Sequence, residues 1–413
     1  MGFPLLRSFA VCGVWCGASL AAWGADWPSW RGLRGDGRSE ESNLPLQWSP
    51  QENIAWQAAI PGKGHSSPIV YGEQVFVTTA LDQDEQHVVQ CLERSTGRLV
   101  WEQRSPAKLQ SAIHKLNSHA SSTPATDGQL VWVSFLDNAD MTIIAYDFMT
   151  GDQRWRTVPG KMLSKHGYCS SVVPYKDLII INGDQDAAGY LVALVAATGQ
   201  ERWRVARPNQ TRSYCAPVIM AVAGRNQLVL SGSLCVAGYD PDSGKLLWMV
   251  DGPTEQFVSS PIYLDEVVLM TYGFPKRGLC AIDPTGEGNV TKTHVLFNVE
   301  ASRRGGYVPS PVAQGKWAFV VSDEGIGSCS DPRTGREIWS ERLGRHHSAS
   351  PVVAAGHVYF VDDSGKCWIV KAADKFELVR VNELGEDTRG SPAISRGQIF
   401  IRGTKHLFCI GAK

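Results

Sequence analysis

Polar side chains gather just ahead of eight recurring small-residue segments, most of which read Ser-Pro. These side chains are mainly histidine, arginine and tyrosine, and they differ from copy to copy. Arginine offers paired donors to a carboxylate or phosphate, and histidine and tyrosine add directed hydrogen bonds, so the set favours a polar or anionic ligand. The candidate ligand-binding residues are His65, His119, His166, Tyr168, Arg212, Tyr214, Arg303, Arg304, Tyr307, His346, His347 and Arg389.

Other chemistries have less support from the spacing of these residues. A metal site is one alternative, because five histidines could meet around an ion; they are His65, His119, His166, His346 and His347. No His-x-x-x-His or Cys-x-x-Cys spacing fixes a geometry, and no Ser/His/Asp or Cys/His arrangement has a supporting motif. A solvated loop rim, polar without any ligand, is the other alternative. We expect neither a catalytic residue nor a metal.

A second recurring segment, Thr-Gly-x-x-x-Trp, shows what must position these side chains. It begins at Thr96, Thr150, Thr198 and Thr334, and a near copy begins at Ser243. The small-residue segments recur with an average spacing of about 46 residues, within the roughly 40–50 residues of a propeller blade. They begin at Ser67, Thr123, Ser171, Ala216, Ser260, Ser310, Ser350 and Ser391.

Each repeat predicts four β-strands. The second is apolar nearly throughout, as in Leu178-Ile179-Ile180-Ile181, which is typical of a strand covered on both faces. The third ends at the Thr-Gly turn, where glycine takes a positive φ, and the fourth carries the Trp. The single helix candidate is a short insertion at residues 107–115. The chain is therefore predicted to be all-β, an eight-bladed β-propeller of four-stranded antiparallel blades over residues 54–413.

The two ends of the chain complement each other. The last repeat stops at Lys413 without a fourth strand, and Ile54-Ala55-Trp56 reads as a fourth strand without a repeat. We expect this N-terminal strand to complete the last blade and close the ring, which removes an exposed sheet edge. Residues 25–53 form a polar lead-in without periodicity, which we expect to be draped over the surface.

Propeller geometry predicts where the candidate residues meet. The first strand of each blade lines the central channel and begins at one mouth. All the candidate side chains are therefore expected to converge on a ring at this mouth, although they are far apart in the sequence. Converging polar groups in a concave site are the default hypothesis for a binding site.

Residues 1–24 read as an export signal. Arg7 precedes an apolar segment from Phe9 to Ala22, and small residues stand at both cleavage-specifying positions before a cut after Gly24. The apolar run is short and interrupted by glycine, which disfavours a retained membrane anchor. A lipoprotein is a lesser alternative, because neither Cys12 nor Cys16 follows a small residue. We expect a periplasmic or secreted protein without a membrane span.

The overall charge bears on the kind of partner. The chain has 40 Lys and Arg residues against 41 Asp and Glu residues, and it shows no run of like charges. A nucleic-acid-binding protein would carry a marked basic excess or stripe. We therefore expect no nucleic-acid partner, and we expect a monomer.

Eight cysteines follow the signal segment, and an even number in an exported protein suggests disulfides. Three of them, at positions 91, 329 and 409, occupy a position held by alanine in other repeats, which predicts small buried apolar residues. Tyr168-Cys169 and Tyr214-Cys215 match each other in neighbouring repeats. A disulfide between blades at Cys169 and Cys215 is left open by the sequence.

The motif Ala-x-Asp-x-x-Thr-Gly-x-x-x-Trp with a preceding Ser-Pro strand resembles the quinoprotein propeller repeat, named for enzymes that bind pyrroloquinoline quinone. The resemblance covers residues 54–413 and is loosest in the fifth and seventh repeats, which lack the Trp. In that family the repeat's tryptophans hold adjacent blades together. The resemblance therefore implies that six residues lie between blades: Trp56, Trp101, Trp155, Trp203, Trp248 and Trp339.

This family includes quinone-dependent dehydrogenases and non-enzymatic scaffolds, such as the propeller lipoprotein of the outer-membrane assembly machinery. The dehydrogenases use a disulfide between adjacent cysteines, a Ca²⁺ ion and a catalytic Asp, whereas this chain has no Cys-Cys pair and no acidic cluster near the candidate residues. We expect closer kinship with the scaffolds: an exported propeller that binds a protein, a peptide or a polar or anionic ligand at the channel mouth, without a cofactor. The alternative is an oxidoreductase that depends on pyrroloquinoline quinone with Ca²⁺, or on a metal.

Overall fold

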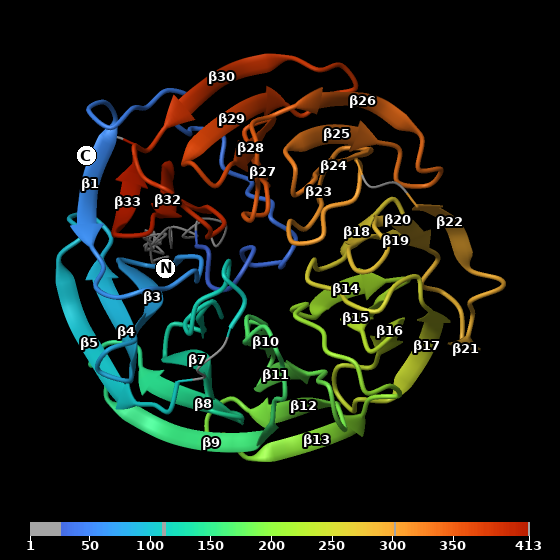
Figure 1. Ribbon diagram of the computed structural model, residues 1–413, viewed down its shortest axis with the longest axis horizontal. Coiled ribbons are helices and arrows are strands. Elements are labelled where there is room, and N and C mark those ends of the chain that lie inside the picture. Colours follow the sequence, from blue (N-terminus) through green and yellow to red (C-terminus); the bar gives the residue numbers. More distant parts are fainter. Residues whose placement is uncertain (1–25, 110–112, 301–302, 412–413) are drawn as a thin grey trace, which may run out of the picture.

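Eight small sheets form a ring around a central channel in the computed structural model, which describes residues 26–109, 113–300 and 303–411 (Figure 1). Seven sheets have four strands each, and the fourth blade gains a short fifth strand. The four strands of each blade pair antiparallel, the extra strand of blade four pairs parallel with its neighbour, and the described residues include no helix. The predicted all-β, eight-bladed propeller is therefore confirmed. The expected export signal lies outside the described residues, as do residues 110–112 of the insertion.

The strands follow the chain from blade to blade. Blade one contains β2 (Ile69–Tyr71), β3 (Gln74–Leu81), β4 (Gln86–Glu93) and β5 (Leu99–Pro106), and blade two contains β6 (Ala125–Thr126), β7 (Leu130–Asp137), β8 (Asp140–Asp147) and β9 (Gln153–Lys161). Blade three contains β10 (Val173–Tyr175), β11 (Leu178–Gly183), β12 (Tyr190–Val195) and β13 (Glu201–Ala206), and blade four contains β14 (Val218–Val222), β15 (Arg225–Gly232), β16 (Cys235–Tyr239) and β17 (Leu246–Asp251), with β21 (Gly288–Asn289) at its edge. Blade five contains β18 (Ile262–Leu264), β19 (Val267–Tyr272), β20 (Gly278–Ile282) and β22 (Val295–Glu300), and blade six contains β23 (Val312–Gln314), β24 (Trp317–Val321), β25 (Ile326–Ser330) and β26 (Glu337–Arg342). Blade seven contains β27 (Val352–Ala354), β28 (His357–Val361), β29 (Lys366–Lys371) and β30 (Leu378–Glu383), and blade eight contains β31 (Ala393–Ser395), β32 (Gln398–Arg402), β33 (His406–Ile410) and β1 (Ile54–Ala59).

Strand sequence follows strand position in the blade. The second strand of blade three, β11, is buried at every position, because adjacent blades cover both of its faces. The outer strand β22 alternates between half-buried and exposed residues, because one of its faces meets solvent. The apolar clusters join neighbouring blades; in one, Ile179 of blade three packs with Trp132 of blade two. The core is thus a ring of interfaces between blades.

In most blades, a tryptophan of the fourth strand joins the blade to the next one. The Trp101 indole lies over Gly151 of blade two, so close that a Cβ on this glycine would come within 2.7 Å of the ring, and its Nε1 donates to the Phe148 carbonyl at 3.2 Å. Gly151 has a φ of +76°, which glycine adopts without strain. Equivalent indole-to-carbonyl bonds are donated by Trp56, Trp155, Trp203 and Trp339. The position implied by the family resemblance is confirmed for these five residues.

Trp248 is also buried in the apolar cluster between blades four and five, as the resemblance implies, but its hydrogen bond departs from this pattern. Its Nε1 donates to the Gln227 side-chain oxygen in its own blade at 2.7 Å, and the Gln227 amide donates to the Pro284 carbonyl of blade five at 3.2 Å. The Gln227 side chain therefore carries the connection between blades that the other indoles make directly. In blade five, Phe297 replaces the Trp and lies against Gly335 of blade six.

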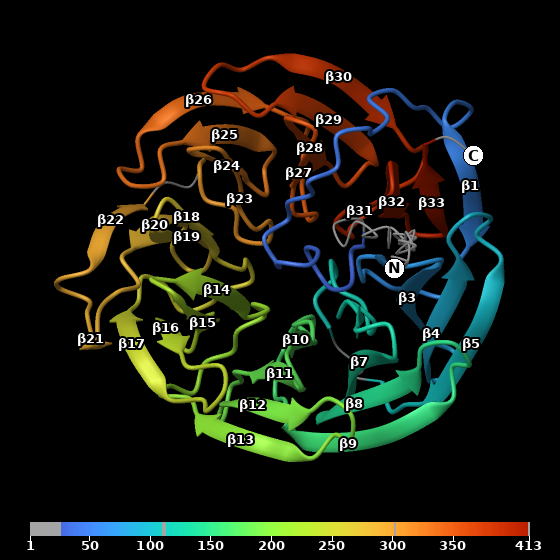
Figure 2. The same ribbon diagram turned by 180° about the vertical axis from the view of Figure 1, so that it is seen from behind.

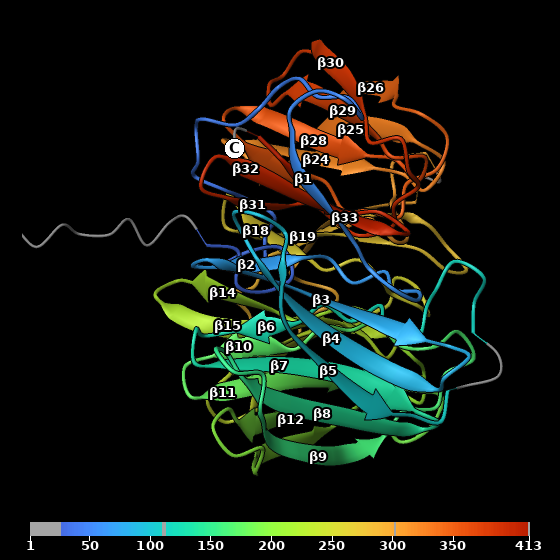
Figure 3. The same cartoon turned by 90° about the vertical axis from the view of Figure 1, so that its left-hand side faces the viewer.

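The ring closes through the N-terminal strand, as predicted. β1 pairs antiparallel with β33, so the first and last strands of the propeller lie side by side (Figure 3). The Trp56 indole then reaches blade one, where it lies over Gly97 and donates to the Arg94 carbonyl at 2.8 Å. Both ends of the propeller are therefore held in one sheet, and that sheet is joined to blade one.

The lead-in is not merely draped over the surface. Residues 26–48 cross the end of the channel opposite the starts of the first strands (Figure 2). Trp27 exchanges backbone hydrogen bonds with Val70 of blade one, and Arg31, only 1% exposed, donates to the Pro311 carbonyl of blade six at 2.5 Å. Trp48 is buried against blades seven and eight. These apolar and hydrogen-bonded anchors explain why a segment without periodicity is held at the channel axis.

Candidate functional site

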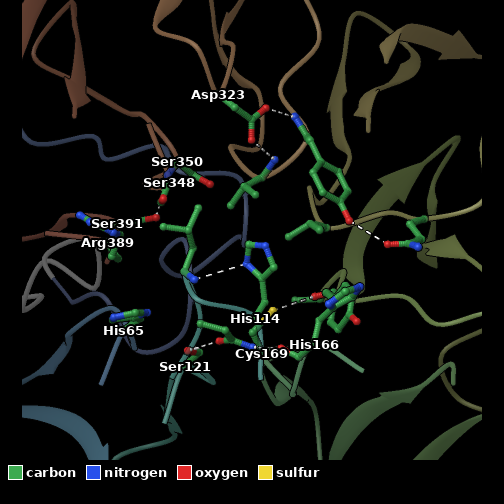
Figure 4. A pocket seen from close by; sticks show the side chains of 18 of the residues that line it. His65, His114, Ser121, His166, Cys169, Asp323, Ser348, Ser350, Arg389 and Ser391 are labelled. Atoms are coloured by element: carbon green, nitrogen blue, oxygen red, sulfur yellow. Dashed lines mark hydrogen bonds between the residues drawn. The ribbon is translucent and has the colours of Figure 1, made fainter. Parts of the chain in front are cut away.

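A cavity of about 720 Å³ occupies the channel at the face where the first strands begin. Its wall comes from all around the ring, as Figure 4 shows: His65 and Arg389 lie on one side, His166 and Cys169 on the other, and His114 lies between them. Propeller geometry brings these residues together, because the segment before each first strand ends at the same mouth. The main polar lining residues are His65, His114, Asn117, Lys165, His166, Arg212, Tyr214, Gln256, Arg277, Tyr307, Asp323, Glu324, His346 and Arg389.

The predicted convergence holds for seven of the twelve candidates. These seven line the cavity: His65, His166, Arg212, Tyr214, Tyr307, His346 and Arg389. They come from segments before the first strands of blades one, three, four, six, seven and eight. That they bind a ligand remains a prediction.

Two of the other candidates are buried in the scaffold. Tyr168 is packed into the apolar cluster between blades two and three, so its hydroxyl does not reach the cavity. His347 is fully buried beside its neighbour His346, and neither ring nitrogen has a hydrogen-bond partner among the described residues. Adjacent residues in an extended segment point in opposite directions, which is why only one residue of each Tyr-Cys or His-His pair faces the cavity.

The remaining three candidates do not line the cavity. Arg304 turns outward to blade six, where it donates to the Gly335 carbonyl at 3.1 Å and pairs with Glu337 at 3.4 Å. Arg303 is exposed to solvent. His119 contacts the Asp82 carboxylate at 3.0 Å, at the outer edge of the mouth. A local partner redirects both Arg304 and His119, which a one-dimensional pattern does not reveal.

Several lining residues were not predicted. His114 lies within the insertion at residues 107–115 that was the helix candidate, Asn117 follows it, and Lys165 comes from the segment after β9. Phe274 and Arg277 come from the connection between β19 and β20. In an antiparallel blade, the connections after the second and fourth strands lie at the end where the first strand begins. Long connections at these two places could therefore have been predicted to contribute residues to the cavity.

Arginines at the mouth are held by carboxylates. Arg212 pairs with Asp186 at 2.6 Å, and its Nε is buried without a partner among the described residues. Arg277 pairs with Glu324. Each guanidinium has five donors, so one carboxylate leaves others free to meet a ligand. Lys165 has no ion-pair partner among the described residues and is exposed at the rim.

Asp363 organises the wall at blade seven. Its carboxylate accepts hydrogen bonds from the Ser348 backbone and hydroxyl at 2.8 and 3.0 Å, and it contacts Nδ1 of His346 at 2.6 Å. Arg389 lies 3.4 Å from the same carboxylate. Asp363 therefore fixes one histidine and one arginine against the cavity.

His65 is a neutral ring at physiological pH. Burial, together with the positive charges of Arg402 and Arg389, lowers the pKa of His65 to about 4. Arg402 is almost fully buried beneath it, where it donates to the Thr78 carbonyl, and its Nε and Nη2 lack partners among the described residues. This part of the wall therefore presents hydrogen-bonding groups in a field of positive charge.

Tyrosines line the opposite part of the wall. The Tyr214 hydroxyl lies 2.7 Å from the Ser164 hydroxyl, and the Tyr307 hydroxyl donates to the Gln256 oxygen at 2.9 Å. Burial raises the pKa of Tyr307 to about 12, so its hydroxyl stays protonated. Phe274 is 51% exposed beside them. The wall therefore offers aromatic surface as well as donors.

The lead-in closes the inner end of the cavity. Trp30 lines this cavity and also a second one, of about 590 Å³, on the far face of the ring. Arg31 stacks on the Trp30 ring at 5.6 Å. Burial lowers the pKa of Arg31 to about 10, which leaves it charged at neutral pH. Trp30 therefore stands between the cavity at the mouth and the cavity on the far face.

A belt of hydrogen bonds encircles the channel at the level of the first-strand starts. In each link, the backbone N–H of one start residue donates to the hydroxyl of the start residue in the next blade. The six links are Ser391 to Ser67, Ser67 to Thr123, Thr123 to Ser171, Ser260 to Ser310, Ser310 to Ser350, and Ser350 to Ser391, with N···O distances of 2.9 to 3.1 Å. The belt explains why hydroxyl residues recur at this position. Blade four has Ala216 instead, and there the belt is interrupted.

The carboxylates do not form a Ca²⁺ site. No group of three or more His, Cys, Asp or Glu side chains is arranged to hold a metal within residues 26–109, 113–300 and 303–411. Asp323 already accepts the backbone N–H groups of Tyr307 and Val308 at 2.7 and 3.2 Å. Glu324 is paired with Arg277, and Asp186 is paired with Arg212. Ca²⁺ takes six to eight oxygen ligands, so the donor set does not fit the quinone–Ca²⁺ pair.

The eight cysteines of the described residues are free thiols. Cys169 lines the cavity and its thiol lies 3.8 Å from the Tyr214 carbonyl, whereas the Cys215 thiol contacts the Ala216 carbonyl at 3.2 Å. The structure therefore does not contain the disulfide between blades that the sequence left open. Burial raises the pKa of Cys215 to about 11, so it remains a thiol at neutral pH.

Solved structures share this fold at low sequence identity. A europium-containing methanol dehydrogenase matches with a TM-score of 0.70 and 12% identity, over 93% of this chain and 91% of that chain. Quinohemoprotein alcohol dehydrogenase from Comamonas testosteroni matches with a TM-score of 0.67 and 12% identity, over 94% and 81%. BamB from Moraxella catarrhalis matches with a TM-score of 0.61 and 12% identity, over 86% and 99%. Identities this low show the fold alone.

Sequence comparison gives a narrower result. A protein of Paracoccus denitrificans that carries the name dehydrogenase XoxF is 26% identical to this chain over 156 residues. The matched region is 34% of this chain and 23% of that protein. The chain thus spans about a quarter of the length of this curated relative. The family described as "Outer membrane protein assembly factor BamB" matches residues 49–218, 187–295 and 292–377. These matches cover most of the propeller, and the chain belongs to this family of pyrroloquinoline quinone-type repeat propellers.

Proposed function

We propose that the chain is an exported, non-enzymatic propeller that binds an anionic ligand in the channel mouth. The ligand is a small carboxylate or an acidic segment of a peptide or protein. The observation that carries this proposal is the convergence of Lys165, Arg212, Arg277 and Arg389 on one cavity, which has Trp30 of the lead-in at its inner end. The family match to an assembly factor supports a binding role, and the location outside the cytoplasm rests on the sequence of residues 1–24.

The free donors of the wall favour an anion over a neutral ligand. Arg212 retains an unpaired buried Nε after its contact with Asp186, and Lys165 has no described ion-pair partner. Hydrogen bonds from charged donors to carboxylates are roughly twice as strong as those between neutral groups. Their strength also rises in a cavity from which water is partly excluded. An anion therefore satisfies groups that the fold leaves open.

The test is isothermal titration calorimetry of the purified protein at neutral pH with succinate, citrate and tetraglutamate. We expect saturable binding of at least one of them, weakened by added salt. Arg212→Gln and Lys165→Gln should each weaken this binding by about tenfold or more, as expected for a charged hydrogen bond worth about 1.5–3 kcal/mol. Arg202→Gln is the matched control. Arg202 lies on the outer strand β13, away from the cavity, and pairs with Asp177. Absence of binding, or equal effects of the three substitutions, would overturn the proposal.

An oxidoreductase is the second candidate, favoured by the likeness in fold to quinone-dependent dehydrogenases. The absence of a suitable carboxylate set among the described residues weighs against it. The protein should be mixed with pyrroloquinoline quinone and Ca²⁺ and assayed by dye reduction with methanol, ethanol and glucose. Turnover above a heat-treated control would establish the second candidate in place of the first.

A further inference from the structure

The belt of hydrogen bonds around the channel has one gap, and the gap faces the cavity. At seven blades a hydroxyl stands at the first-strand start, whereas blade four has Ala216. The Ser171 N–H, which by analogy with the other links would donate to this position, has no hydrogen-bond partner within the described residues. Ala216 instead offers its carbonyl to the Ser260 hydroxyl at 2.6 Å. Ser171 and Ala216 both line the cavity.

An unpaired N–H at this depth is unusual. Leaving a buried donor without a partner costs about 1–3 kcal/mol, and more than nine-tenths of buried backbone N–H groups have one. Six of the eight start residues donate their N–H to a hydroxyl of the next blade. In the described part of the chain, the two that do not are Ser171 and Ala216, on either side of the blade-four position, where the Ser260 hydroxyl is turned to donate to the Ala216 carbonyl. The gap is therefore a place where an external acceptor gains a hydrogen bond that the chain itself does not make.

A second observation points to the same part of the wall. Arg212 belongs to the segment that leads to Ala216, and its Nε is buried without a partner among the described residues. The segments before blades three and four touch where the Ser170 hydroxyl donates to the Cys215 carbonyl at 3.0 Å, and Ser171 and Arg212 of these two segments both line the cavity. A backbone donor and a guanidinium are thus available on neighbouring segments.

We propose that a carboxylate of the bound ligand completes the belt at blade four. One oxygen accepts the Ser171 N–H in place of the missing hydroxyl, and the other accepts from Arg212. This inference deepens the proposed function and rests on it. It names the ligand group as a carboxylate, because two oxygens on one planar carbon can meet two donors that approach from adjacent segments.

The test compares two variants of equal shape. Ala216→Thr supplies the hydroxyl that Thr123 supplies in blade two, and Ala216→Val fills the same space without it. In the protein without ligand, Ala216→Thr should have the higher Tm, and the Ser171 amide should exchange hydrogen more slowly. Succinate should bind Ala216→Thr at least about tenfold more weakly than Ala216→Val, because its acceptor site is already filled.

Controls separate the gap from general effects on the belt. Ala216→Ser adds the hydroxyl with the smallest change in volume, so it replaces Ala216→Thr if the larger residues prevent folding. Ser310→Ala removes the hydroxyl that accepts the Ser260 N–H, and Ser310 does not line the cavity. This variant should therefore have a lower Tm and an unchanged affinity for succinate. Protection of the Ser171 amide by succinate in the unaltered protein would support the inference directly.

The outcomes distinguish this inference from the proposed function. Equal affinities of succinate for the Thr and Val variants, with the unaltered protein still binding succinate, would overturn the completed belt and leave anion binding intact. No binding of succinate, citrate or tetraglutamate to the unaltered protein would overturn both proposals. In that case the difference in Tm between the Thr and Val variants would still report whether the belt is open at Ala216.

Discussion

The indole of Trp101 lies over Gly151 of the following blade, and a Cβ on this glycine would come within 2.7 Å of the ring. Gly151 is therefore required twice, by its φ of +76° and by this contact. Gly315 is a matched position, because its φ is +57° and a Cβ there would meet nothing within 4 Å. Gly315→Ala should cost about 1–2 kcal/mol of unfolding free energy for the left-handed conformation. Gly151→Ala should cost a further 1–3 kcal/mol or so for overpacking, measured by urea denaturation. Equal costs would show that the indole moves aside freely.

Arg207 and Asp184 form an ion pair whose side chains are both fully buried between blades three and four, with Nε and Oδ1 2.8 Å apart. Arg207 also donates to the Tyr239 hydroxyl and to the Gly232 carbonyl. Arg207→Met should cost about 3–5 kcal/mol, because it leaves a buried carboxylate without its partner. Arg202→Met removes an exposed pair on the same blade and should change unfolding free energy little. Similar costs for the two variants would contradict this account.

Burial pushes the pKa of Asp184 upward, against the charge of Arg207. Without Arg207 only the burial effect remains, and Asp184 should become protonated more readily. The destabilisation caused by Arg207→Met should therefore be smaller at pH 5 than at pH 8. A cost that is independent of pH would indicate that water reaches the carboxylate.

His347 should make the protein sensitive to acid. Burial lowers its pKa to about 4, against 6.5 for the ordinary side chain, so the unfolded state binds the extra proton first. Stability that is fully present above about pH 6.5 should therefore fall as the pH drops towards 4, with a slope of up to about 1.4 kcal/mol per pH unit from this residue. His347→Leu should flatten this decline and cost little at pH 7, because neither ring nitrogen has a described partner. His406→Leu, at a half-buried histidine paired with Glu386, serves as the comparison.

The repeat made the propeller predictable. Strands covered on both faces appear in the sequence as apolar runs, and most third strands are followed by a Thr-Gly turn. The segment around Trp56 has the sequence of a fourth strand but no first three strands before it. These are local signals, repeated often enough for their errors to cancel. Trp248 shows their limit, because the Gln227 side chain that connects it to blade five carries no mark in the motif.

The candidate site was harder to predict because side-chain direction is decided by partners distant in the sequence. His346 faces the cavity through its contact with Asp363, whereas its neighbour His347 faces the core. Arg304 is drawn outward by the Gly335 carbonyl and Glu337. The closure of the channel by Trp30 and Arg31 could not be anticipated either, because the lead-in has no period and its anchors lie in blades one, six, seven and eight.

The course of the lead-in also sets the orientation of the molecule relative to anything attached ahead of it. Asp26 accepts a hydrogen bond from the Gly72 N–H in the turn after β2, on the face opposite the cavity mouth. A tether, a fusion partner or a solid support joined at that point would therefore hold the propeller by its closed face. The open mouth, with its arginines and tyrosines, would be directed away from the attachment and towards whatever approaches from the surrounding medium.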